Sequence, residues 1–119
     1  MTAPKTVLEV LIAARELISV PKRWTQHTFA LDAHGDESEP NEPGAVCWCA
    51  LGAIRHVCGE SSRADWSLLA LSADDALEVV LPRHVDGIDA FNDDAATQHA
   101  DVIAAFDRAI AAERGRGAS

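Results

Sequence analysis

Cys49, His99 and Asn92 are residue types that together can carry out nucleophilic catalysis. In such a set, the histidine removes the thiol proton, the thiolate attacks an acyl group, and the asparagine orients the imidazole ring. His27 is an alternative base, and Asp93 is an alternative orienting group. We place Cys49 on the second turn of a helix, where the effect of the helix dipole on a thiol pKa is already fading. The catalytic set therefore depends on the fold bringing these groups into contact.

The cysteines also have non-catalytic interpretations. Cys49 beside Gly52 could be a small buried residue that lets two helices pack closely. The spacing of four residues resembles a zinc-binding motif: Cys47, Cys49, His56 and Cys58. On one helix, however, Cys47 and Cys49 would point about 200° apart, whereas zinc needs its ligands within about 2.3 Å. We predict no metal and no cofactor.

A second group of polar residues lies next to large aromatic side chains at the expected ends of elements. The candidate binding residues in this group are Trp24, Gln26, His27 and Asp93. Partly buried polar groups must find hydrogen-bond partners. The group therefore either caps and joins elements or lines a small ligand pocket beneath Trp24 and the long polar loop that follows.

The first element that must position these residues is a helix from about Lys5 to Ser19. Thr6 and Glu9 have the spacing of a capping box at its start, and Pro21 ends it. Its apolar arc is so broad that we expect the helix to be largely enclosed. The arc consists of Val7, Leu8, Leu11, Ile12, Ala14 and Ile18, widened by Val10 and Leu17.

The segment 45–59 is predicted to be the central helix, because it is apolar nearly all round. Pro43 suits its start and Gly59 its end. Two short helices should begin at Ser62-x-x-Asp65 and Ser72-x-x-Asp75. Residues 83–94 should form a connection, and an amphipathic helix should run from about 97 to 113. No strand pattern is evident. We therefore expect a compact all-α single domain over residues 1–114, with four or five helices around the central one, an acidic loop at 32–44 and a frayed tail at 115–119.

The composition excludes several functional classes. The chain has 119 residues, 19 acidic and 10 basic, and a net charge of −9. Nucleic-acid and anionic-membrane binding need clustered lysines and arginines, which the sequence lacks. The longest apolar run, near residues 7–14, contains Glu9 and is too short to span a membrane. No leader sequence opens the chain, and an odd number of cysteines suits a reducing compartment. We expect a cytoplasmic protein.

The order of several motifs resembles a family of small bacterial and phage proteins known only as a domain of unknown function. The motifs are Trp24-Thr-Gln26, Trp48-Cys49-Ala-Leu-Gly52-Ala53-Ile54, Phe91-Asn92-Asp93, His99-Ala-Asp-Val102 and Phe106-Asp107-Arg-Ala-Ile110. They span most of the chain. The resemblance implies no activity, but it implies a shared role for Trp24, Cys49, Gly52, Asn92, Asp93 and His99.

The sequence favours a small acidic binding or interaction protein whose partner is a protein or a small ligand. Its charge suits a basic patch on a partner, or mimicry of nucleic acid in an inhibitor. The sequence leaves a homodimer as an alternative, because the first helix is apolar nearly all round. The alternative function is a Cys–His hydrolase or transferase with Cys49 as the nucleophile. A ligand pocket under Trp24 is a third hypothesis.

Overall fold

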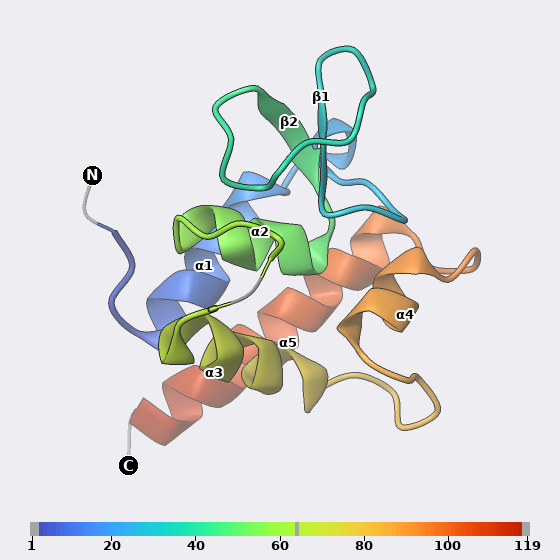
Figure 1. Cartoon of the computed structure of the whole chain (residues 1–119). Coiled ribbons are helices and arrows are strands. Elements are labelled where there is room, and N and C mark those ends of the chain that lie inside the picture. Colours follow the sequence, from blue (N-terminus) through green and yellow to red (C-terminus); the bar gives the residue numbers. More distant parts are fainter. Residues whose placement is uncertain (1–2, 64, 118–119) are drawn as a thin grey trace.

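The structure is a computed structural model that describes residues 3–63 and 65–117, and it is mostly helical with a small β-sheet (Figure 1). Within these residues the elements are α1 (Val7–Leu17), η1, a 3-10 turn (Pro21–Arg23), β1 (Ala30–Asp32), β2 (Ala45–Trp48), α2 (Ala50–Val57), α3 (Leu68–Glu78), α4 (Ile88–Asp93) and α5 (His99–Gly117). The prediction of a purely all-α fold is wrong, because β1 and β2 pair as an antiparallel hairpin. Figure 1 shows this hairpin above α2, at one end of the helical layer.

Helix α1 begins where the sequence predicted. The Thr6 hydroxyl accepts the Glu9 N–H at 3.1 Å, and the Glu9 carboxylate accepts the Lys5 N–H at 2.9 Å. The carboxylate thus reaches one residue further back than in a standard capping box. Helix α1 packs against α2, α3 and α5, so it shares the centre of the fold with the predicted central helix. Its fully buried positions are Val10, Leu11, Ala14 and the following Ile18.

The hairpin replaces the first part of the helix predicted over 45–59. Ala45 and Cys47 are buried whereas Val46 is exposed, which is the alternation of a strand. Cys49 is still extended, and the helix begins only at Ala50. The sequence does not indicate this change from strand to helix, because every position from 45 to 50 is apolar. Neither the two-residue period of a strand nor the 3.6-residue period of a helix can be recognised there. The predicted end is confirmed: α2 stops before Gly59, which has a φ of 71°.

The acidic loop 32–44 is folded back onto α2. The carboxylate of Asp32 accepts the N–H groups of His34 and Asp36 at 2.9 and 3.0 Å, which forms a tight turn. Further along, Pro40 is buried, and its carbonyl accepts a hydrogen bond from Trp48 Nε1 at 3.0 Å. The first half of the loop is therefore a turn closed on itself, and the second half is held against β2 and α2 through Pro40, whose carbonyl also lies 2.6 Å from His56 Nδ1.

Helix α3 is a single helix where two were predicted. It begins after Ser67, whose hydroxyl accepts the Ala70 N–H at 3.1 Å, and Ser72 lies inside it. The predicted start at Ser62 fails because its hydroxyl donates to the Glu39 carboxylate instead. A competing tertiary partner has taken the capping group.

The C-terminal third contains one helix more than predicted. The short helix α4 follows Gly87, with a φ of 104°, inside the stretch expected to be a connection. Helix α5 starts at His99, where the Asp101 carboxylate accepts the Gln98 N–H at 2.9 Å. It runs past the predicted end to Gly117, while residues 118 and 119 of the expected tail lie outside the described residues. None of the helices among the described residues is both long and apolar enough to cross a bilayer.

Candidate functional site

The side chain of Asn92 is the centre of a hydrogen-bond network that joins three distant segments. Asn92 is 1% exposed. Its Oδ1 accepts hydrogen bonds from Trp24 Nε1 at 2.7 Å and from the Ala50 N–H, at the start of α2, at 3.0 Å. Its Nδ2 donates to the Thr25 carbonyl and to the Asp93 carboxylate, both at 3.0 Å. An amide side chain offers two acceptor and two donor positions, so Asn92 is saturated within the protein.

Gln26 and Asp93 extend this network along the chain before β1. Gln26 Nε2 donates to the backbone carbonyls of Asn92 and Asp94 at 2.9 and 3.1 Å. The Asp93 carboxylate accepts the His27 N–H at 2.8 Å. His27 has a φ of 71°, a left-handed conformation that non-glycine residues seldom adopt. The network therefore fixes the backbone of residues 24–27, while the His27 side chain remains exposed.

His99 joins the start of α5 to the end of α1. Its Nε2 lies 2.7 Å from the Ile18 carbonyl. Because a carbonyl can only accept a hydrogen bond, Nε2 carries the proton. The imidazole also lies against the Trp24 indole, with ring centroids 6.0 Å apart. His99 thus adjoins the Asn92 network through an aromatic contact.

Cys49 caps the start of α2 with its sulfur. Its Sγ accepts the Gly52 N–H at 3.2 Å, and the residue is 7% exposed. Burial raises the pKa of the Cys49 thiol to about 11; the Gly52 N–H opposes this change, and the negative charge of Asp93 adds to it. At neutral pH only about one thiol in 10⁴ is ionised. The environment therefore keeps the sulfur as a neutral capping group.

Gly52 is required by the close approach of the chain before β1. A Cβ atom at this position would lie 1.9 Å from the Phe29 carbonyl oxygen. That same carbonyl accepts the Cys49 N–H at 3.2 Å. The backbone of Phe29 therefore lies directly on the first turn of α2, and any larger side chain at Gly52 would prevent this contact.

The structure brings the candidate binding residues together but does not join the catalytic set. Trp24, Gln26, His27 and Asp93 all contribute to the network around Asn92. Among the described residues, by contrast, no hydrogen bond links the Cys49 sulfur to a histidine ring. Cys49, His99 and Asn92 each bond elsewhere. Asn92 and His99 bond to segments from the N-terminal part of the chain, at residues 24–25 and at Ile18, whereas Cys49 caps α2.

An open cleft of about 560 Å³ lies beside this network. One wall is the segment 27–29, the second is the acidic loop, and the third is formed by Ser62 and Arg63. Among the described residues that line the cleft, Arg63 is the only basic side chain of the lysine or arginine type. The Ser62 hydroxyl donates to the Glu39 carboxylate at 2.5 Å and links two of the walls. The acidic side chains that line the cleft are Asp32, Glu37, Glu39 and Glu42.

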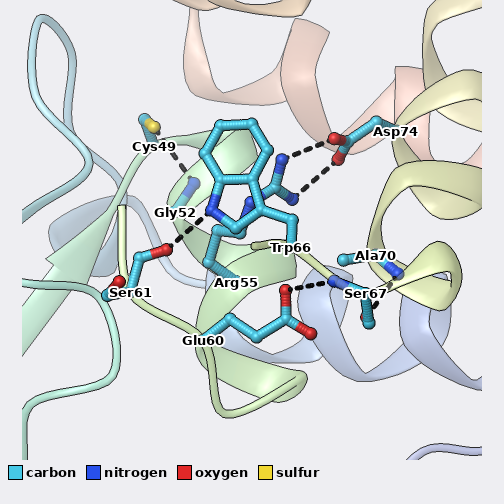
Figure 2. A network of polar contacts seen from close by, with 9 residues as sticks. All are labelled: Cys49, Gly52, Arg55, Glu60, Ser61, Trp66, Ser67, Ala70 and Asp74. Atoms are coloured by element: carbon cyan, nitrogen blue, oxygen red, sulfur yellow. Dashed lines mark hydrogen bonds and ion pairs between the residues drawn. The ribbon is translucent and has the colours of Figure 1, made fainter. Parts of the chain in front are cut away.

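A second buried network, around Arg55, escaped the sequence analysis (Figure 2). Arg55 is 0% exposed and makes a two-pronged ion pair with Asp74, at 2.9 and 2.5 Å. The Trp66 ring covers the guanidinium, with its centroid 4.0 Å from Cζ. The Nε of Arg55 has no hydrogen-bond partner among the described residues. Burial raises the pKa of Asp74, an effect that the hydrogen bonds from Arg55 oppose.

The chain between α2 and α3 holds Trp66 over Arg55. Trp66 Nε1 donates to the Ser61 carbonyl at 3.0 Å, and the Ser67 N–H donates to the Glu60 carboxylate at 3.1 Å (Figure 2). The sequence signal for this network was a single arginine in a helix whose other residues, apart from His56, are apolar. A fully buried charge requires a partner, but nothing local identified Asp74 as that partner.

The four residues that looked like a zinc signature are placed apart. Cys47 is in β2, Cys49 caps α2, and Cys58 follows the end of α2. His56 Nδ1 lies 2.6 Å from the Pro40 carbonyl. Within residues 3–63 and 65–117, no three His, Cys, Asp or Glu side chains are grouped so that they could hold a metal ion.

The fold and these networks define a small, mostly helical domain with a β-hairpin, in which a saturated asparagine ties the segment before the hairpin to the start of α2. The model of a family of unknown function (DUF6197) matches residues 2–112, and the chain belongs to this family. The resemblance that the motifs suggested is thereby confirmed. Neither the curated proteins nor the solved structures contain a significant match.

Proposed function

We propose that this protein is a non-catalytic binding domain whose acidic cleft takes a cationic segment of a partner protein. The observation that carries this proposal is the lining of the cleft: four acidic residues and one arginine line a space of about 560 Å³. That volume falls within the range of ligand-binding clefts. Its charge is the reverse of what a phosphate-bearing ligand would require.

The chemistry of the cleft suits arginine side chains best. Glu37 and Glu42 are exposed and make no side-chain hydrogen bond among the described residues. A carboxylate can accept two parallel hydrogen bonds from one guanidinium, which gives such a contact both strength and direction. The overall charge of −9 adds long-range attraction toward a basic partner.

The Asn92 network supports this function by fixing the position of one wall. It holds residues 24–27, and Gly52 lets Phe29 rest on α2. A binding surface built on a rigid support loses less conformational entropy when it is occupied. The polar residues that suggested catalysis would in this view be positioning residues for the cleft.

The cytoplasm is the proposed compartment. Cys47, Cys49 and Cys58 are all free thiols. Unpaired cysteines suit a reducing environment.

The test is calorimetric titration with an unlabelled peptide of alternating glycine and arginine at low salt. We expect Glu37→Gln with Glu42→Gln to weaken binding about fivefold to thirtyfold, since each exposed ion pair contributes up to about 1 kcal/mol. Raising the salt to about 1 M, where the Debye length is about 3 Å, should abolish binding.

The matched control is Asp75→Asn with Glu78→Gln, which removes the same charge from exposed positions on α3. Its affinity should stay within about twofold of the unmodified protein. An equal loss in both double variants would mean that the peptide senses only net charge, and the cleft would not be the binding site.

A further inference from the structure

A groove of about 840 Å³ runs along one face of α1, away from the acidic cleft, with which it shares no lining residue. Ile12, Ala13 and Leu17 of α1 form its apolar floor. Val57, at the end of α2, contributes to its side. The groove therefore lies between two helices that pack directly against each other.

This groove accounts for the unusual width of the apolar arc on α1. The core uses only part of the arc, including Val10, Leu11 and Ala14, which are fully buried. Ile12 and Leu17 remain partly exposed and line the groove instead. Contiguous apolar surface left open to water typically marks an interaction site.

The charges around the groove are acidic and regularly spaced. Glu9 and Glu16 both line it and are two helical turns, or about 10.5 Å, apart. One oxygen of Glu9 accepts the Lys5 N–H, which leaves the other oxygen for a partner. Among the described residues of the lining, none is a lysine or an arginine. Arg15 donates from its Nε to Asp107 of α5 at 2.9 Å, and its guanidinium also lies 3.5 Å from the Glu16 carboxylate. This ion pair with Glu16 is solvent-exposed and weak, so a partner's base can compete for Glu16.

We infer that the groove docks an amphipathic helix of a partner protein, with an apolar stripe flanked by two basic residues seven positions apart. The stripe covers the floor at helical spacing, and the two bases face Glu9 and Glu16. A second copy of this chain is the wrong occupant, because an antiparallel α1 pair would oppose Glu9 with Glu16 of the other copy. The charge of −9 on each copy adds to that repulsion.

The probe is a synthetic helical peptide with leucines along one face and two lysines spaced seven residues apart, measured by fluorescence anisotropy. The variant Ala13→Arg places bulk and positive charge in the floor, and we expect it to weaken binding at least tenfold. Ala112→Arg makes the same change at an exposed position of α5 and should stay within twofold. A peptide of the same composition in scrambled order should bind at least tenfold more weakly.

A charge swap keeps the test independent of folding defects. Glu16 is exposed and its ion pair with Arg15 is a weak surface pair, so Glu16→Lys should leave the circular dichroism spectrum unchanged. The substitution should lower the affinity for the lysine peptide about threefold and raise the affinity for a matching glutamate peptide by a similar factor. Unchanged binding in both Ala13→Arg and Glu16→Lys would overturn the proposal.

Two further outcomes separate this surface from its alternatives. The double variant Glu37→Gln, Glu42→Gln should bind the helical peptide normally, because it changes only the acidic cleft; a matching loss would overturn the groove as the docking site. Sedimentation should show a monomer. A dimer that Ala13→Arg dissociates would instead assign the groove to a second copy of the chain.

Discussion

The networks around Asn92 and Arg55 are both buried and both join elements far apart in the sequence, yet they stabilise the fold in opposite ways. Asn92 is neutral, and its four hydrogen-bonding positions are filled. Arg55 is charged and depends on the carboxylate of Asp74, and its Nε finds no hydrogen-bond partner in the part of the chain that the structure describes. A saturated amide fixes geometry at little desolvation cost, whereas a buried charge is tolerated only while its partner is present.

The largest effect should come from removing the partner of the buried charge. Asp74→Ala leaves Arg55 without a counter-charge, and we expect a loss of about 3–5 kcal/mol in the free energy of unfolding, measured with urea. Replacing both residues, as Arg55→Met with Asp74→Leu, should restore most of the loss. A decrease below about 1 kcal/mol in Asp74→Ala would show that water reaches the guanidinium.

The Asn92 network should respond less to the isosteric change Asn92→Asp. The carboxylate keeps the shape but loses both donors and faces the Thr25 carbonyl and the Asp93 carboxylate. We expect a loss of about 2–4 kcal/mol at neutral pH. The loss should shrink as the pH falls, because protonation of the new carboxyl group restores one donor. A pH-independent loss would contradict the assigned contacts.

Cys49, which lies next to the Asn92 network, should make the free energy of unfolding depend on pH in the alkaline range. Its pKa is raised from 9.0 to about 11 in the folded protein. Between these values the unfolded state releases the proton first, so the free energy of unfolding should decline as pH rises, by about 2 kcal/mol near pH 11. Below pH 9 this thiol has no effect. In the control Cys49→Ala, the free energy of unfolding should lack this decline between pH 9 and 11. Identical pH dependences of the two proteins would refute the raised pKa of Cys49.

The smallest effect should come from uncovering Arg55. Trp66→Leu removes the ring over the guanidinium while the ion pair with Asp74 remains. We expect a loss of about 1–2 kcal/mol in the free energy of unfolding. If Trp66→Leu costs as much as Asp74→Ala, the indole and not the carboxylate is the main partner of the charge.

The sequence predicted those features that depend on local chemistry. The caps at Thr6 and Gly59 and the gathering of Trp24, Gln26 and Asp93 follow from residue types at the ends of elements. The β-hairpin did not follow, because a continuously apolar stretch has no readable period. The single helix α3 did not follow either, since Ser62 bonds to a distant glutamate that a local pattern cannot show.

For the candidate site, too, local sequence patterns do not identify partners that are distant along the chain. That the polar residues share one neighbourhood could be predicted, but what they do there depends on which partner each one finds. Asn92 is filled by four groups of the protein itself, and His99 bonds the Ile18 carbonyl. The acidic cleft is assembled from three separate segments, so only the fold reveals it.

The most direct test of the proposed cleft is a ¹H–¹⁵N NMR titration of the intact protein with the glycine–arginine peptide. The account predicts chemical-shift changes in residues 27–29, 37–42 and 62–63, which line the cleft or lie in its acidic loop, with little change along α3. Shifts that spread over the whole acidic surface, or that centre on α3, would contradict it.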